Sequence, residues 1–222
     1  MLDAVIIVSG GMDSVTLLHY LVTAKHINPA IITFLYNQKH IKEVECAKEN
    51  AAILKCKDHL IIDISFLKSL FDGSSLVSPD LEIPEMKDVI GDPQPSTYVP
   101  NRNMIFLALA AAYAEKLQVS NIYYGAQKHD EYGYWDTTLQ FLEQLNNVYE
   151  LNRKRTIQVK APFINYSKKD ILKLGISLGV DYAKTWSCYN GGSLSCGKCP
   201  TCVERLKAFS DLGLIDPLSY ET

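Results

Sequence analysis

The amino-acid sequence predicts an α/β fold in which helices cover both faces of a doubly wound, parallel sheet. Three observations support this fold class. Short apolar runs rich in Val, Ile, Phe and Tyr alternate with longer amphipathic stretches. The runs are continuously apolar, as expected for strands that are buried on both faces. A loop rich in Gly and Ser directly follows the first run, at the end of a strand where α/β proteins bind ligands.

The elements follow one another in the order strand, helix, strand. The apolar runs place strands at Ala4–Val8, Pro29–Tyr36, His59–Ile64 and Asn121–Gly125. Amphipathic stretches predict helices over Ser14–Lys25, His40–Leu54 and Asn103–Leu117, and two more over residues 168–180 and 203–213. We therefore expect an α/β domain over residues 1–165 and a helical C-terminal segment over residues 166–222.

Two segments interrupt this alternation. Residues 72–100 contain five prolines and are too long for a plain connection, so they form either a mobile binding loop or an ordered surface excursion. Residues 126–137 (AQKHDEYGYWDT) are polar and aromatic and directly follow a predicted strand. Loops in that position commonly contact substrates in α/β proteins.

Composition and charge exclude several classes of function. The 222 residues carry a formal net charge of −3, which argues against stable binding to nucleic acid through phosphate neutralisation. The densest basic cluster, residues 152–155, is interpreted as a solvated turn. No apolar stretch approaches the roughly 20 residues that span a bilayer, and the N-terminus does not resemble a signal peptide. We expect a cytoplasmic protein with reduced cysteines.

Residues 9–14 read SGGMDS and have the character of an anion-binding loop. Gly10 and Gly11 allow a tight turn and close backbone approach, and the following helix N-terminus directs free N–H groups at an anion. Ser9 and Ser14 add hydroxyl groups, and Asp13 can cap N–H groups or help to hold Mg²⁺. The loop is neither a Walker loop nor a Rossmann loop. A glycine turn without a ligand remains the alternative.

Four of the six cysteines lie close together in the last 35 residues, with the spacing C-x7-C-x2-C-x2-C at Cys188, Cys196, Cys199 and Cys202. Two successive C-x2-C spacings and a fourth cysteine predict one structural Zn²⁺ per chain, because four thiolates leave no open coordination position. Two disulfides and an iron–sulfur cluster are the alternatives. Cys46 and Cys56 are interpreted as small buried hydrophobic residues.

The loop SGGMDS resembles the pyrophosphate loop, SGGxDS, of the N-type ATP pyrophosphatases, also called the PP-loop superfamily. Members of this superfamily activate an oxygen as its adenylate and release pyrophosphate. The resemblance implies a five-stranded sheet of the adenine nucleotide alpha hydrolase type. It also implies that the domain over residues 1–165 binds ATP with Mg²⁺ through Val8, Ser9, Gly10, Gly11, Met12, Asp13, Ser14 and Thr16.

Four further strings resemble one branch, the 7-cyano-7-deazaguanine (preQ0) synthases. They are YNQKH at 36–40, STYVPNRN at 96–103, a Gly125 to Phe141 pattern that includes Asp130, Tyr134 and Asp136, and TWSCYNGG…CGKCPTCVERLKAF at 185–209. The chain departs from the branch at Asn101, where Gly is usual, at Lys128–His129, where an acidic pair is usual, and over residues 132–138, where the branch reads SGYPDCR.

This second resemblance implies a ligase. The family converts 7-carboxy-7-deazaguanine, ammonia and ATP into the nitrile, AMP and pyrophosphate, through an adenylated carboxylate and then an adenylated amide. It implies a homodimer, catalytic roles for Asp13, Ser14 and Arg102, and substrate contacts from Arg102, Asp130, Tyr134 and Asp136. Tyr134 or Trp135 can stack on the base. Asn101 and Asn103 are interpreted chiefly as helix caps.

Other functions remain open on the sequence. A tRNA sulfur transferase shares the pyrophosphate loop and often has zinc-binding cysteines, and a variant enzyme can act on a related 7-deazapurine. A nucleotide-binding module without turnover is the non-enzymatic alternative. The nitrogen donor is expected to be free ammonium or ammonia from a separate partner, because no glutaminase-like domain is visible.

Overall fold

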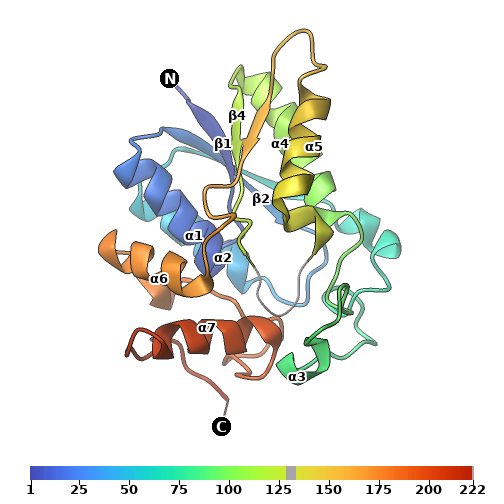
Figure 1. The fold of residues 1–222 in the computed structure, drawn as a ribbon, viewed down its shortest axis with the longest axis vertical. Helices are drawn as coiled ribbons and strands as arrows, with labels where there is room; N and C mark the ends of the chain where they lie inside the picture. Colours follow the sequence, from blue (N-terminus) through green and yellow to red (C-terminus); the bar gives the residue numbers. More distant parts are fainter. Residues whose placement is uncertain (129–133, 222) are drawn as a thin grey trace.

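The computed structural model of the chain describes residues 1–128 and 134–221. Its centre is one parallel sheet of five strands in the order β3-β2-β1-β4-β5 (Figure 1). The strands are β1 (Ala4–Ile7), β2 (Pro29–Leu35), β3 (Asp58–Asp63), β4 (Asn121–Tyr123) and β5 (Gln158–Lys160). The predicted doubly wound sheet is therefore confirmed, and the order of strands reverses between β1 and β4.

Helices cover both faces of the sheet. The α-helices are α1 (Met12–His19), α2 (Lys42–Ile53), α3 (Met86–Val89), α4 (Arg102–Leu117), α5 (Leu139–Tyr149), α6 (Lys168–Ser177) and α7 (Pro200–Ser210). There are also shorter helical segments of other types. η1 (Tyr20–Ala24) is a π-helix, and η2 (Ser65–Leu70), η3 (Trp135–Thr137) and η4 (Tyr182–Lys184) are 3₁₀-helices.

Two hydrophobic clusters attach these helices to the sheet. On one face, Leu107 of α4 and Phe141 of α5 pack against strand residues such as Ile122. On the other face, Leu17 of α1, Ala47 of α2 and Ile171 of α6 pack against residues such as Ile6 and Ile31. Figure 1 shows α4 and α5 on one side of the strands and α1, α2 and α6 on the other.

The proline-rich segment of residues 72–100 is an ordered excursion. Leu76 and Val77 are buried in a cluster with Phe71 and Val99. The segment also reaches the C-terminal part of the chain, because the Met86 N–H donates to the Lys198 carbonyl over 3.0 Å. The segment is therefore packed as the second alternative expects, and its Leu76 also lines the cavity described below.

The part of the chain after α6 is packed firmly on α1 and α6. Met12 and Val15 of α1 join Leu172 of α6 and Phe209 of α7 in one buried cluster. The fully buried guanidinium of Arg205 donates to both carboxylate oxygens of Asp216, over 2.6 and 3.0 Å. These bonds attach the chain end to α7. None of the helices in the described residues combines the length and apolar character that a bilayer crossing requires.

Candidate active site

A cavity of about 240 Å³ opens at the carboxyl ends of β1, β2 and β4, where the strand order reverses. Five parts of the chain form its walls: the SGGMDS loop, the end of β2 with the start of α2, Leu76 of the proline-rich segment, the start of α4 with the loops after β4, and the C-terminal segment. Polar and aromatic groups around it include Ser9, Gly11, Asp13, Tyr36, Glu43, Arg102, Gln127, Tyr134, Lys168, Ser187, Tyr189 and Glu204.

The SGGMDS loop is organised by its own atoms. The Ser14 hydroxyl oxygen accepts the N–H groups of Ser9 and Gly10, each over 3.2 Å, and donates to the Gly11 carbonyl. Gly10 has φ +98°, and a Cβ there would lie 1.8 Å from the Glu43 carbonyl oxygen, so only glycine fits. The loop is therefore shaped before any phosphate arrives, and Ser14 does the shaping.

The loop acquires a lysine from a distant helix. Lys168 is the first residue of α6, and its Nζ lies 2.6 Å from Asp13 Oδ2 and 3.7 Å from Glu204 Oε2. Burial of Lys168 opposes its charge, but Asp13 and Glu204 together raise the pKa of the ammonium group. Asp13 Oδ1 is buried and accepts no hydrogen bond within the described part of the chain. The sequence shows no pattern that links residue 168 to the loop.

The remaining residues predicted to bind ATP divide into two groups. Val8, Ser9, Gly11 and Met12 line the cavity, as do Asp13 and Ser14. Thr16 does not line it, since its buried hydroxyl donates to the Met12 carbonyl over 2.7 Å and lies 2.8 Å from the Tyr182 hydroxyl. In this structure Thr16 connects α1 to the C-terminal segment.

Arg102 lies on the opposite side of the cavity, in the first turn of α4. Its guanidinium donates to the Tyr36 hydroxyl over 3.3 Å. Burial of Arg102 opposes its charge, yet Tyr36, Tyr189 and Tyr134 raise the pKa of the guanidinium. Among the described residues no carboxylate forms an ion pair with Arg102. A half-buried cation among tyrosine rings is suited to bind a planar anion.

Asn101 corrects one expectation from the sequence. It precedes α4 with φ +53° and ψ 21°, a left-handed conformation, and its side chain makes no capping hydrogen bond. Asn is among the few side chains other than Gly that tolerate this conformation. Instead, Asp136 Oδ2 accepts the Asn103 N–H over 3.4 Å at the start of α4.

The predicted substrate loop is only partly described. Asp130 lies outside the described residues. Tyr134 lines the cavity, and its hydroxyl lies 2.7 Å from that of Thr97. Asp136 is 2 % exposed and lies behind the cavity wall, where burial raises the pKa of its carboxyl group although Arg102 lowers it. Asp136 thus supports the helix that carries Arg102.

Trp135 connects the loop after β4 to the end of the proline-rich segment, directly before α4. Its indole Nε1 donates to the Tyr98 hydroxyl over 2.8 Å, and the same oxygen accepts the Asn101 N–H over 3.1 Å. The Trp135 ring is 44 % exposed and meets Phe141 edge to face. Trp135 itself does not line the cavity, so Tyr134 is the aromatic side chain of this loop that faces it.

Two ionisable groups at the start of α2 also face the cavity. Burial raises the pKa of the Glu43 carboxyl group to about 7, although Arg102 lowers it. Burial lowers the pKa of the His40 imidazole to about 4, so this ring is neutral at physiological pH. The sequence patterns do not single out Glu43, because it is one of several charged residues on a predicted amphipathic helix.

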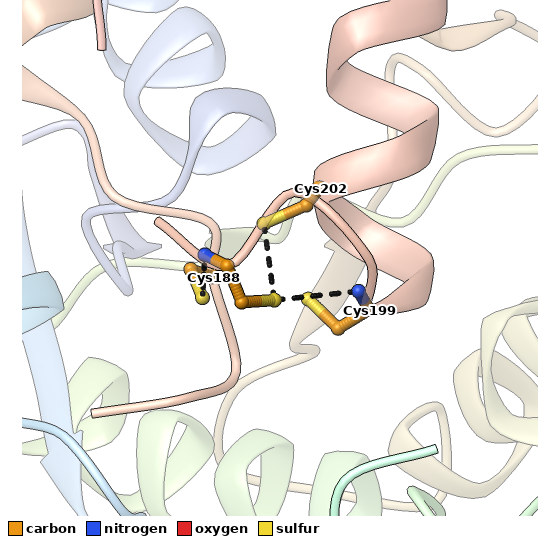
Figure 2. Close-up of side chains that lie close together, drawn as sticks. Cys188, Cys199 and Cys202 are labelled. Atoms are coloured by element: carbon orange, nitrogen blue, oxygen red, sulfur yellow. Dashed lines mark hydrogen bonds between the residues drawn. The ribbon is translucent and has the colours of Figure 1, made fainter. Parts of the chain in front are cut away.

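The four cysteines predicted to bind a metal come together. All are buried, their sulfur atoms lie within 4.8 Å of one another, and none forms a disulfide. Figure 2 shows Cys188, Cys199 and Cys202 converging from the preceding loop and the start of α7. Cys196 Sγ lies 4.0 Å from Cys202 Sγ, close to the edge of about 3.8 Å in a tetrahedral zinc–thiolate site. The cluster can therefore hold a metal ion.

The cysteine cluster is connected directly to the SGGMDS loop. The Trp186 backbone N–H donates to the Gly10 carbonyl over 3.1 Å, and its indole donates to the Cys188 carbonyl over 3.0 Å. The Lys42 ammonium lies over the Trp186 ring at 4.0 Å and donates to the Gly192 carbonyl. These contacts join the cysteine segment to the loop and to the start of α2.

Comparison with known proteins identifies the family. The family model described as Queuosine biosynthesis protein QueC matches residues 3–213. Proteins named 7-cyano-7-deazaguanine synthase from Psychromonas ingrahamii and Methanoregula boonei are each 43% identical to this chain. The alignments cover 98% and 99% of this chain, and 97% and 100% of those proteins.

A solved structure supports the fold alone. The U34-tRNA thiolase NcsA from Methanococcus maripaludis, solved with its iron–sulfur cluster, superimposes with a TM-score of 0.50 at 14% identity. The superposition covers 95% of this chain and 66% of the thiolase. The near-complete sequence match, together with the loop and cysteine cluster on one fold, shows that the chain belongs to the QueC family of queuosine biosynthesis proteins.

Proposed function

We propose that this protein converts 7-carboxy-7-deazaguanine and ammonia to 7-cyano-7-deazaguanine, with ATP cleaved to AMP and pyrophosphate in two rounds. The observation that carries the proposal is a single cavity with a preformed anion loop on one side and Arg102 on the other. The near-complete sequence match to proteins named for this synthase supports it.

The loop side is assigned to ATP. A carboxylate is a poor electrophile, so its oxygen must first become a leaving group, which adenylation achieves. The N–H groups at the start of α1 and the ammonium of Lys168 would bind the departing pyrophosphate. Asp13 would hold Mg²⁺ beside the phosphates, and the buried, unpaired Oδ1 of Asp13 is suited to that role. Ser14 would contribute through the shape of the loop.

The Arg102 side is assigned to the deazaguanine. Its guanidinium would bind the carboxylate, and the rings of Tyr134 and Tyr189 would contact the base. Asp136 would act by holding the start of α4 in place. The expected contact from Asp130 stays a prediction. In the second round the amide oxygen would occupy the same position and be adenylated in turn, after which loss of AMP gives the nitrile.

Zinc is the metal proposed for the cysteine cluster. Four buried sulfur ligands at tetrahedral spacing suit Zn²⁺. The ion would be structural, one per chain. Unpaired cysteines are in keeping with a reducing, cytoplasmic setting. A homodimer, and free ammonium as the nitrogen source, remain part of the proposal.

A tRNA sulfur transferase is a weaker candidate for this chain. Such an enzyme usually needs a reactive cysteine in its active site. Cys46 and Cys56 do not line the cavity, and burial raises the pKa of the Cys46 thiol to about 11. A thiol with that pKa is a poor nucleophile at neutral pH.

The decisive experiment is a direct assay. Purified, zinc-loaded protein is incubated with ATP, Mg²⁺, ammonium and 7-carboxy-7-deazaguanine, and AMP and the nitrile are followed by mass spectrometry. The proposal expects two AMP for each nitrile. Absence of AMP would reject it, and accumulation of the amide without nitrile would instead indicate a one-round enzyme. Release of AMP only with a related deazapurine would change the substrate.

A further inference from the structure

We propose that Glu43 is the general base that accepts protons from the attacking nitrogen in both rounds of the reaction. This inference rests on the proposed function and adds a residue that neither the motifs nor the family comparison assigns. Glu43 lies in the first turn of α2 and its side chain lines the same cavity as the SGGMDS loop and Arg102.

The position of Glu43 is fixed by close packing. Its backbone carbonyl touches Gly10 so closely that no side chain fits there. Its carboxylate oxygen Oε1 lies 3.8 Å from the place that a Cβ on Gly11 would occupy. The carboxylate therefore stands beside the loop, with its helix anchored against that loop.

The carboxylate has no competing partner. Within the described residues, Glu43 forms no ion pair, and no donor makes a hydrogen bond to its carboxylate. Most other acidic groups near the cavity are engaged: Asp13 with Lys168, and Asp136 with the Asn103 N–H. A carboxylate that faces a reaction cavity without a partner is available for proton transfer.

The location matches the chemistry. The adenylated intermediate joins the α-phosphate, which belongs beside the loop, to the deazaguanine, which belongs beside Arg102. Glu43 borders the loop and is close enough to Arg102 for their charges to interact. The carbon that ammonia attacks lies at the junction of these two halves, so a base at Glu43 faces the nitrogen as the C–N bond forms.

The proton balance is the same in each round. In the first round, Glu43 accepts a proton from ammonium, the resulting ammonia attacks the acyl carbon, the C–O bond to AMP breaks, and a second proton from the nitrogen passes to solvent. In the second, the protonated imidate formed by adenylation of the amide oxygen loses one nitrogen proton to solvent and the other to Glu43, the nitrogen electron pair completes the C≡N bond, and AMP leaves with the oxygen. Glu43 returns each proton to solvent.

Its surroundings suit a base at neutral pH. The groups that act electrostatically on Glu43 are Arg102 from α4, Tyr36 after β2, and Cys46 on the next turn of its own helix. Gly11 and the Trp186 carbonyl, which also border this corner, carry no titratable group. Burial outweighs Arg102 and raises the pKa of Glu43 to about 7, the range in which a general base is most effective.

The test separates adenylation from nitrogen transfer in Glu43→Gln. Exchange of labelled pyrophosphate into ATP, with 7-carboxy-7-deazaguanine and no ammonium, reports adenylation. Amide and nitrile formation report the later steps. Hydroxylamine supplies a nucleophile that is already unprotonated at neutral pH, so hydroxamate formation reports attack that needs no base.

We expect Glu43→Gln to retain exchange and hydroxamate formation within about threefold, and to lose nitrile formation with ammonium by about 100-fold or more. At a fixed total ammonium concentration, wild-type nitrile formation should level off above about pH 7, whereas in the variant it should keep rising with pH as more ammonium loses its proton to solvent. Glu45→Gln is the matched control, because Glu45 is exposed on the same helix and pairs with Lys48. Metal content and the midpoint of thermal unfolding verify folding.

Three results would overturn the inference. Nitrile formation within a few fold of wild type would show that no base is needed at this position. Equal loss of pyrophosphate exchange would place Glu43 in adenylation, and failure of hydroxylamine to react would assign it a positioning role. If the wild type itself shows no exchange with this substrate, the proposed function fails instead. Should Glu43→Gln not fold, Glu43→Asp with the same readouts takes its place.

Discussion

The two sides of the cavity are built in different ways. Most of the loop side consists of groups within six consecutive residues, which Ser14 holds in shape from inside the loop, and Lys168 is added from α6. The Arg102 side consists of side chains from distant segments, namely Tyr36 after β2, Tyr134 directly before η3, and Tyr189 from the cysteine segment. A side made from local backbone can be recognised in a short string. A side assembled from distant side chains depends on the complete fold.

Loss of the cysteine cluster should have the largest effect, because both sides of the cavity rest on it. Cys199→Ser removes one buried sulfur ligand, so bound zinc should fall from about one ion per chain to near zero. The free energy of unfolding should drop by about 4 kcal/mol or more. Elemental analysis and urea unfolding measure the two quantities.

Cys56→Ser is the matched control for that change, because Cys56 is a half-buried thiol outside the cluster. It should retain its metal and cost about 1 kcal/mol or less. Full zinc content in Cys199→Ser would remove Cys199 from the ligand set.

A substitution at Gly10 should break the loop side alone. Gly10→Ala puts a Cβ at 1.8 Å from the Glu43 carbonyl in a residue with φ +98°, so the loop and α2 must separate. We expect a loss of about 3 kcal/mol of stability and no measurable ATP binding. Gly179→Ala separates the effect of a positive φ from that of a steric clash. Gly179 has φ +75°, but no atom lies within 4 Å of the place that a Cβ would occupy. This substitution should cost about 1 kcal/mol and leave ATP binding intact, as calorimetry would show.

A substitution at Arg102 should damage the other side. Arg102→Lys retains the charge but loses the planar pair of donors, so kcat/KM for the deazaguanine should fall about 100-fold. The dissociation constant for ATP should stay within about twofold of wild type. The mirror change, Lys168→Gln, should weaken ATP binding about tenfold instead. Steady-state kinetics with each substrate varied would reveal the split, and equal effects on both substrates would contradict a divided cavity.

The smallest effect is expected at the contact between Trp135 and Tyr98. Trp135→Phe retains the ring against Phe141 but removes the 2.8 Å bond to Tyr98, worth about 1 kcal/mol. The KM for the deazaguanine should rise about fivefold and that for ATP should not change. Tyr98→Phe removes the same bond and also the acceptor of the Asn101 N–H, so the double variant should be no worse than Tyr98→Phe alone. Additive effects would show that the two residues act separately.

The fold was largely predictable because β1 and β2, at the centre of the sheet, are apolar along almost their whole length and β3 has an apolar middle. β5 is harder to recognise, since Gln158–Lys160 contains one apolar residue and is identified only by pairing with β4. α5 was also absent from the expected elements, although Phe141, Leu142 and Leu145 have helical spacing and are buried. The segment 72–100 could not be assigned, because its order comes from packing of Leu76 and Val77 against distant residues.

The candidate site was predictable where its groups are local. The hydrogen-bond partners within the SGGMDS loop lie inside six residues, and the four cysteines lie inside fifteen. The four cysteine sulfur atoms come together as expected. Lys168 and Glu43 could not be predicted as site residues. Each faces the cavity because its whole helix docks near the loop, and no spacing in the sequence encodes that docking. Asn101 was misinterpreted as a cap because Asn is favoured both at helix caps and at left-handed backbone positions, and the sequence does not distinguish the two.

The bond from Trp186 to Gly10 has a consequence for the newborn protein. A chain leaving the ribosome completes the SGGMDS loop long before Trp186, which supports this loop, has been synthesised. The nascent chain therefore lacks this support until about 170 further residues have been added. With the proposed zinc in the cysteine cluster, cellular metal supply then decides how many of these chains mature.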